Sequence, residues 1–309
     1  MKKLLSLALA CLSISVQSLA ADCCPRDCYS DCFGFDSVLT FDVGGGYRMD
    51  SLKWKIFPAY DPGRQVEEQW KNIGSGVVET NAQFLACEHY LLMADFDFGW
   101  FTNKGSQRYT GIGGTINPIN LKSNPRGNVY NLSGGLGYQF NFDCYRVSFA
   151  PLAGYSYHQQ RFKSRTYKNQ IISDVLAPSL VLAHNNYKFR WSGPWVGFAL
   201  AYQATCELQV YVDYYYHWAR FHGTVKERFA FFPGQFPTHL KSNRVYGNEF
   251  TVGTTYTFCD YWYVGVKYDY KQFCGNKGKA NEETSDFDSA LRSLEWRSST
   301  ITLDIGYTF

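Results

Sequence analysis

The sequence of 309 residues lacks any apolar run long enough to cross a membrane as a helix. A spanning helix needs about 20 consecutive apolar residues, and Asp, Asn or Gly interrupts the apolar stretches here before they reach that length. The sequence also lacks an excess of charge of one sign, with 30 Lys and Arg against 27 Asp and Glu. This balance offers no basic surface for nucleic acid and predicts no acidic partner.

The first 20 residues form a short apolar segment of the kind that directs export. Lys2 and Lys3 give it a positive start, residues 4–12 are its apolar part, and small residues near Ala20 provide a cleavage site. We therefore expect residues 1–20 to be removed as a signal peptide and the mature chain to leave the cytoplasm.

Aromatic residues are unusually abundant, since 24 Tyr, 24 Phe and 8 Trp make up 18% of the chain, together with 27 Gly. The last ten residues show how they are used. Ile301, Leu303, Ile305, Tyr307 and Phe309 alternate with polar residues or glycine, which is the period of a β-strand. A single strand of this kind fits a soluble sandwich as well as a membrane barrel, where the apolar face meets lipid and the polar face meets the lumen.

Nine further segments repeat this alternation, and short turns between them alternate strictly with long loops. A sandwich has no reason for such regularity, whereas outer-membrane barrels have short periplasmic turns and long external loops. We therefore predict an all-β, transmembrane antiparallel β-barrel of about ten strands over residues 36–309. A strand pair within residues 170–184 would make twelve. The expected strands are residues 37–57, 70–86, 90–101, 129–142, 145–158, 187–204, 208–221, 248–258, 261–273 and 296–309.

Eight cysteines are expected on the periplasmic side of this barrel. Four lie in residues 21–35, predicted to be a periplasmic N-terminal segment, and one lies in each short turn. Some spacings in the N-terminal segment would suit zinc, but an exported chain favours disulfides. These disulfides are either internal or link the chain to other proteins. We favour intermolecular disulfides for at least some of the cysteines, because strand hydrogen bonds already fix the turns. The candidates are Cys23, Cys24, Cys28, Cys32, Cys87, Cys144, Cys206 and Cys259.

Several charged residues are expected to project into the lumen. They form a network of paired charges that fixes the strand register, a constriction that selects solutes by charge, or both at once. The histidines are dispersed without metal-ligand spacing, and no nucleophile–base pair stands out, so we expect no catalytic residue, cofactor or metal. The lumen candidates are Asp95, Asp97, Asp213, Glu249, Lys267, Asp269, Lys271 and Asp304.

The residues 1–5, the cysteine-dense start of the mature chain, the cysteine-bearing turns and the ending Tyr307-Thr308-Phe309 resemble chlamydia-type outer-membrane porins, in particular the protochlamydial outer-membrane protein family. The resemblance implies an abundant, disulfide-linked envelope protein with pore activity, and Tyr307 and Phe309 as the barrel assembly signal. It also implies outer-membrane lipid, the barrel-assembly machinery, further copies or cysteine-rich envelope proteins, and small solutes as partners. About eight strands give a filled interior and about 16 an open channel, so ten or twelve predict at most a narrow pore.

The order of strands and loops also resembles the omptins, which are ten-stranded outer-membrane proteases. The similar stretches are residues 152–157 with Arg161 and Phe162, and residues 188–197. Omptins place an acid pair on the second external loop and an Asp–His pair on the fourth. Here the second loop, residues 102–128, has no Asp or Glu, and the fourth has His222, Glu227 and His239 but no Asp. We therefore predict an omptin-like shape and no enzyme; a surface protease or an adhesin that uses the loops remains the alternative.

Overall fold

The computed structural model describes residues 37–57, 65–102, 105–110, 119–122, 124–143, 145–165, 184–228, 235–258, 261–282 and 288–309. All regular elements in these ranges are β-strands, and none of these residues belongs to a helix that could span a bilayer. Residues 1–35, predicted to be the signal peptide and the periplasmic segment, lie outside the described residues. So does the strand pair considered within residues 170–184, apart from His184.

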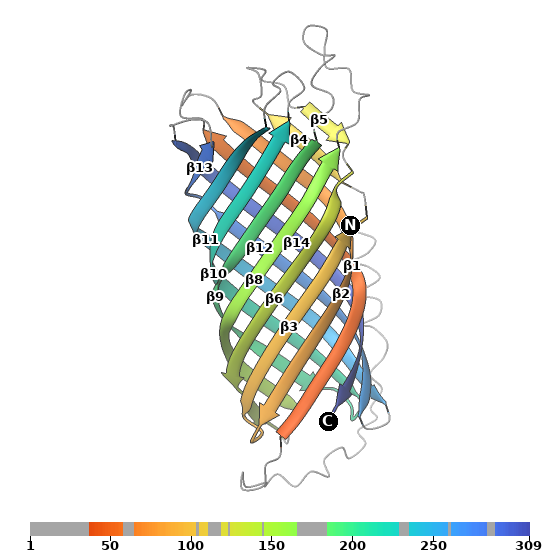
Figure 1. The fold of residues 1–309 in the computed structure, drawn as a ribbon. Helices are drawn as coiled ribbons and strands as arrows, with labels where there is room; N and C mark the ends of the chain where they lie inside the picture. Colours follow the sequence, from red (N-terminus) through yellow and green to blue (C-terminus); the bar gives the residue numbers. More distant parts are fainter. Residues whose placement is uncertain are drawn as a thin grey trace.

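Ten long strands form a closed antiparallel barrel (Figure 1). Each pairs with its neighbours along the chain, and β1 also pairs with β14, which closes the sheet. The predicted fold is confirmed. The strands are β1 (Ser37–Phe57), β2 (Val66–Ala86), β3 (Tyr90–Phe101), β6 (Arg126–Tyr138), β8 (Val147–Arg165), β9 (His184–Gln203), β10 (Leu208–Arg228), β11 (Gln235–Phe258), β12 (Trp262–Gly275) and β14 (Asp288–Thr308).

Four short strands extend this sheet. β4 (Ser106–Thr110) and β5 (Ile119–Lys122) form a hairpin on β2, and β13 (Gly278–Glu282) pairs with β11 and β14. β7 (Phe140–Phe142) pairs with β8 and follows β6 after a break at Gln139. The single strand predicted over residues 129–142 is therefore two strands.

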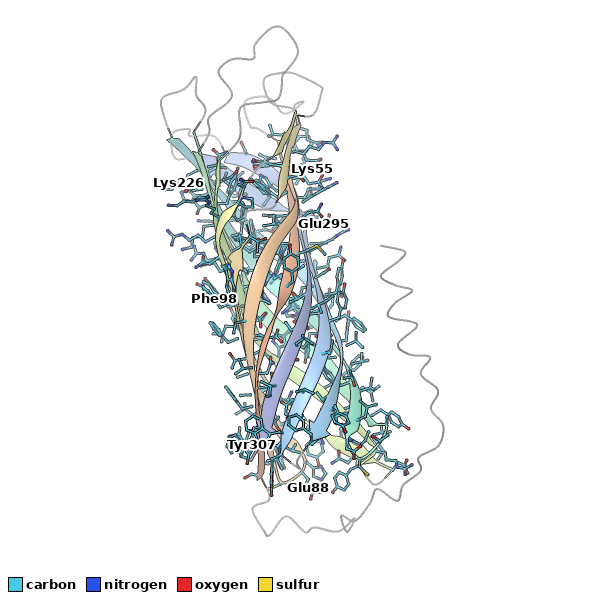
Figure 2. All side chains as sticks on the ribbon, turned by 90° about the vertical axis from the view of Figure 1, so that its right-hand side faces the viewer. Lys55, Glu88, Phe98, Lys226, Glu295 and Tyr307 are labelled. Atoms are coloured by element: carbon cyan, nitrogen blue, oxygen red, sulfur yellow. The ribbon has the colours of Figure 1, made fainter. Side chains whose placement is uncertain are left out.

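Short turns lie at one end of the barrel, where β1 begins and β14 ends. Glu88 and Tyr307 mark this end in Figure 2, while Lys55 and Lys226 mark the other. The three-residue turn between β2 and β3 holds Cys87 and Glu88 at positive φ of 49° and 58°, the backbone conformation of a tight hairpin turn. By the usual orientation of outer-membrane barrels, this end faces the periplasm.

The half of the barrel near the short turns has an apolar outer face and a polar inner face. On β14, Leu303 is 66% exposed on the outer face, while Thr302 and Asp304 are buried inside. We call this half the membrane segment. It comprises residues 37–49, 74–100, 130–158, 193–218, 246–271 and 299–309, as far as they are described.

The other half has the opposite polarity, and we call it the external segment. On β9, Tyr187, Phe189 and Trp191 are buried inside, whereas Lys188 and Arg190 lie on the outer face. The apolar positions change parity between Trp195, which points inward, and Val196, which points outward. The external segment comprises residues 50–57, 66–73, 126–129, 159–165, 184–192, 219–228, 235–245, 272–275 and 288–298.

This change of parity corrects several predicted boundaries. The predicted fourth loop, residues 222–246, is mostly strand, because β10 continues to Arg228 and β11 begins at Gln235. Likewise β2 begins at Val66, β8 ends at Arg165 and β14 begins at Asp288. Where the apolar side chains move from the outer to the inner face of a strand, the alternation in the sequence breaks. The part of the strand beyond that break was therefore wrongly predicted to be loop.

An aromatic core fills the lumen of the external segment. Trp54 on β1 contacts Phe189 on β9 with ring centroids 5.3 Å apart. In the order of the sheet these strands are separated by β2, β3, β6 and β8 on one side and by β14, β12, β11 and β10 on the other, so the contact crosses the barrel. The buried residues of the core are Leu52, Trp54, Trp70, Ile73, Phe101, Val129, Phe162, Tyr187, Phe189, Trp191, Ala219, Phe221, Val225, Leu240, Val245, Phe273, Ala280, Leu291, Leu294 and Trp296.

Candidate functional site

A polar cavity of about 430 Å³ occupies the lumen of the membrane segment. It extends from His158 and Glu249, below the aromatic core, to Gln139, Thr257 and Thr308 near the end with the short turns. All eight charged residues predicted to face the lumen line this cavity, and the structure therefore brings them together. Asp42, Glu79 and His158 also line it, and they were not among the predicted candidates.

Strand alternation places these groups, and glycine makes room for them. Successive inward positions on β12 are Lys267, Asp269 and Lys271, each separated by one outward residue. On β1, a side chain at Gly44 would collide with the Asp304 carboxylate, so glycine permits the close approach of this carboxylate to the strand. The sequence placed Gly44 in a strand but could not identify its neighbour on β14.

Most of the lumen charges form a paired network. Lys267 Nζ lies 2.8 Å from Glu79 Oε1, and Lys271 Nζ lies 2.6 Å from Glu249 Oε1 and 3.9 Å from Asp97 Oδ2. The remaining acceptors use neutral donors: Asp97 accepts from Asn131 Nδ2 at 2.8 Å, Asp269 from Thr251 Oγ1 at 2.6 Å, and Asp42 from Tyr263 OH at 3.0 Å. These contacts join strands around the barrel, as expected of a network that fixes register.

Three of the cavity's carboxylates are less well satisfied. Asp95 and Asp213 form no hydrogen bond or ion pair within the part of the chain that the structure describes. Asp304 is 9% exposed, and its Oδ1 has no hydrogen-bond partner among the described residues. These side chains lie on β3, β10 and β14, so they face the lumen from different sides.

The roof of the cavity contains two histidines. His217 Nδ1 lies 3.1 Å from Ser156 Oγ, and His217 Nε2 lies 3.2 Å from Glu249 Oε2. The order serine, histidine, carboxylate matches a nucleophile, base and orienting acid. However, Ser156 is only 2% exposed and is not among the described residues that line the cavity, so a substrate has no route to it there. The arrangement is a buried network, and its members come from β8, β10 and β11, which no sequence spacing connects.

His158 differs from its neighbour because it has no polar partner. It is 1% exposed, and neither ring nitrogen has a hydrogen-bond partner among the described residues. Its ring packs against Phe273 at 5.2 Å and Trp296 at 5.5 Å between centroids, and it lines the top of the cavity.

A buried ion pair marks the boundary between the two segments. Arg48 Nε lies 3.1 Å from Asp50 Oδ2, and the Trp296 indole donates to Asp50 Oδ1 at 3.1 Å. Arg48 and Asp50 are each 1% exposed, and the guanidinium lies 5.5 Å from the centre of the Trp296 ring. Their inward alternation on β1 was visible in the sequence, but their pairing was not predicted.

The predicted disulfide candidates are only partly described. Cys23, Cys24, Cys28, Cys32, Cys144 and Cys259 lie outside the described residues. Cys87 is a free thiol in a short turn, and Cys206 is disulfide-bonded. That bond is not to Cys87 or to Cys274, because both are free.

The proposed assembly signal lies at the periplasmic end of the seam between β1 and β14. Tyr307 faces outward and packs against Trp262 and Phe309, with ring centroids 5.0 and 4.6 Å apart. Phe309 is 69% exposed, and its backbone N–H donates to the carbonyl of Leu39 at 2.8 Å. Its role as a signal stays a prediction. Within the described ranges, no three His, Cys, Asp or Glu side chains are arranged to hold a metal ion.

Comparison with known proteins gives one family and several barrels of similar fold. The family described as Protochlamydia outer membrane protein matches residues 42–309. The crystal structure of the outer membrane protease OmpT from Escherichia coli is similar with a TM-score of 0.73 at 13% identity, covering 89% of this chain and 98% of OmpT. The Pseudomonas putida toluene transporter TodX matches more weakly, with a TM-score of 0.36 at 10% identity over 90% of each chain. No curated protein sequence matches this chain.

Proposed function

This chain belongs to the Protochlamydia outer membrane protein family, and from that premise we propose that its barrel strengthens the cell envelope without forming an open channel. The family and the barrel fold locate the protein in the outer membrane. We expect membrane lipid to cover the apolar face of the membrane segment, and the barrel-assembly machinery to insert it.

The observation that carries this proposal is the aromatic core. Contacts between opposite strands, such as Trp54 with Phe189 and Trp191 with Trp296 at 4.7 Å, occupy the lumen of the external segment. A protein interior packed in this way leaves few voids larger than a water molecule. The polar cavity below it is then closed toward the outside. A lumen filled in this way disfavours the pore activity that the family resemblance implies, and favours a structural role.

Conductance of the purified protein in a planar lipid bilayer tests the proposal. We expect no steady channel events at neutral pH. A matched variant that opens the core, W191A/W296A, is expected to produce brief or unstable openings if it folds. Steady conductance of the unaltered protein would contradict the closed lumen and support the porin alternative.

The second part of the proposal is that cysteines at the periplasmic end join the barrel to further copies or to cysteine-rich envelope proteins. It is supported by the free thiol of Cys87, a half-buried residue in a short turn at the end of the barrel, where a neighbouring protein can approach it. Because the hydrogen-bonded strands already fix this turn, a staple there adds little to the barrel itself. The disulfide at Cys206 lies within the chain, so that cysteine supports internal stapling instead.

Envelopes separated on non-reducing and reducing gels test the cross-linking. We expect bands of higher mass that collapse on reduction and that weaken in the C87S variant. The C274S variant provides the control, because Cys274 is the other described free thiol but lies on β12 in the external segment. A monomer of the same mobility on both gels would contradict the proposal.

We further propose that the chain is not an omptin-like protease. Glu68 is a buried acid in the lumen of the external segment. It accepts hydrogen bonds from Trp70 Nε1 at 2.8 Å, Gln107 Nε2 at 2.7 Å and Tyr187 OH at 2.9 Å. A carboxylate engaged in this way is poorly placed to activate a water. We expect no cleavage of basic or acidic test peptides by the folded protein, and turnover that persists after repurification would reopen the alternative. The adhesin alternative concerns loops that lie largely outside the described residues.

A further inference from the structure

We propose that the lumen cavity of the membrane segment is a binding site for a small organic cation of the amine class, which enters from the periplasmic end. A structural role in the envelope needs no such ligand, so this inference goes beyond the function proposed above. It depends on the cavity alone and not on conductance or cross-linking.

The lining of the cavity is strongly acidic. Eight carboxylate side chains and only two lysines line the cavity. Glu79 and Glu249 are held by the two lysines, and three of the other six carboxylates, Asp42, Asp97 and Asp269, accept from neutral donors. Carboxylates confined in a space walled by protein and lipid repel one another far more than they would in water. A bound cation offsets that repulsion. The eight are Asp42, Glu79, Asp95, Asp97, Asp213, Glu249, Asp269 and Asp304.

Several carboxylate oxygens in the cavity accept no hydrogen bond from the described residues. Asp95 and Asp213 have no hydrogen bond or ion pair within the described residues, and the Oδ1 atom of the buried Asp304 has no donor there. Asp95 and Asp213 are half-buried, whereas Asp304 is buried, and buried polar groups in folded proteins are almost always satisfied, so the Asp304 Oδ1 atom needs an explanation. Because these three residues face the cavity from different strands, a molecule with several N–H donors can reach more than one of them.

His158 gives an independent indication of a ligand. It is 99% buried, it lines the top of the cavity, and both of its ring nitrogens lack a partner among the described residues. A neutral imidazole carries one acceptor nitrogen, which can receive a hydrogen bond from an ammonium group. The roof of the cavity therefore offers a neutral acceptor in addition to the carboxylates of the walls.

The size of the cavity, and the aromatic and apolar side chains among its polar lining, favour an alkyl amine over an inorganic ion. Its volume of about 430 Å³ lies within the range typical of small-molecule sites. Tyr211, Tyr215 and Tyr263 line it together with Met93 and Leu152, and these can contact methylene groups between ammonium groups. Among the described residues no three His, Cys, Asp or Glu groups form a metal site.

The route of entry follows from the two ends of the cavity. Toward the outside, Phe273 and Trp296 of the aromatic core lie directly against His158. Toward the short turns, the lining continues through Gln209 to Thr257 and Thr308 at the strand ends. We therefore expect the cation to enter from the periplasm, past the strand ends.

Calorimetric titration of the folded protein in nonionic detergent with spermidine tests the inference. We expect saturable binding that survives a background of sodium chloride, weaker binding of 1,4-diaminobutane, and none of glutamate. The D95N/D213N variant keeps the shape of both side chains and removes two unpaired charges, so its affinity for spermidine should fall about tenfold or more. The control E295Q removes one carboxylate from the outer face of the external segment and should bind as the unaltered protein does.

Two results would overturn the inference. One is the absence of binding at millimolar spermidine together with a D95N/D213N variant of raised melting temperature, which shows that the carboxylates are neutralised by protons. The other is an affinity for spermidine that falls in E295Q but not in D95N/D213N. That result would place the bound spermidine on the outer surface. Where the double variant does not fold, as judged by heat-dependent gel mobility, the single variants D95N and D213N serve with the same expected direction.

Discussion

The membrane segment and the external segment are built from the same strands, yet their polarity is opposite. On β14, Ile301 and Leu303 face lipid, while Trp296 and Leu294 face the lumen. In both segments the apolar side chains avoid water, but water lies inside one segment and outside the other. The difference teaches that strand alternation determines which residues share a face, and that the surrounding solvent determines which face must be apolar.

The largest effect is expected from a cavity in the aromatic core. Trp296 is fully buried and contacts Trp191, Phe273 and His158. W296A should reduce the free energy of unfolding by about 3–5 kcal/mol. The control W100A removes an outward indole that is 50% exposed, where lipid can fill the space, so its loss should be smaller. Urea unfolding in lipid vesicles measures both, and equal losses would show that the two faces are packed alike.

A somewhat smaller effect is expected at the boundary between the segments. R48M leaves the buried Asp50 carboxylate without its guanidinium partner, which should cost about 3 kcal/mol, near the lower end for such a loss, because the Trp296 indole still donates to it. The double variant R48M/D50L should recover most of that stability, since it removes both charges. A double variant as unstable as R48M would show that the loss of stability comes from the missing ion pair and not from the unpaired Asp50 carboxylate.

A charge introduced on the outer face should affect stability differently in the two segments. L303R introduces a guanidinium into the lipid-facing band and should lower the free energy of unfolding by about 2–3 kcal/mol. S293R makes the same addition on the outer face of the same strand in the external segment, and should change stability by less than about 0.5 kcal/mol. Similar losses in both variants would contradict the assignment of the two segments.

The smallest effect concerns the outer surface of the external segment, where Glu67 lies 2.9 Å from Lys53 Nζ and 3.0 Å from Lys55 Nζ. Partial burial acts to raise the pKa of Glu67, but hydrogen bonds and attraction from both lysines together outweigh it and hold the pKa below its usual 4.5. The stabilisation is therefore present above about pH 4.5 and is lost as the pH falls through the lowered value. E67Q should cost about 0.2–1 kcal/mol at pH 7 and nothing at pH 2. Denaturant titrations at both pH values measure the difference, and a cost that does not depend on pH would contradict it.

The sequence predicted the membrane segment well because one rule applies along each strand there. The alternation of Phe96, Phe98 and Trp100 with Asp95 and Asp97 indicated both the lipid face and the lumen face. The same rule failed in the external segment, where Tyr187, Phe189 and Trp191 occupy the opposite parity, so parts of β10, β11 and β14 were predicted to be loop. The cavity could be predicted only in part, because contacts such as Ser156 with His217, or Arg48 with Trp296, depend on the register between distant strands.

Because β1 pairs with β14, the barrel can close only after β14 has been synthesised. Thr40 pairs with Thr308, so the first strand finds its second neighbour only when the last strand has been made. A chain that ended before β14 would expose two rows of unpaired backbone groups in hydrocarbon, where each costs several kcal/mol. Truncated products should therefore fail to insert and remain substrates for periplasmic proteases, so that only full-length barrels accumulate in the membrane.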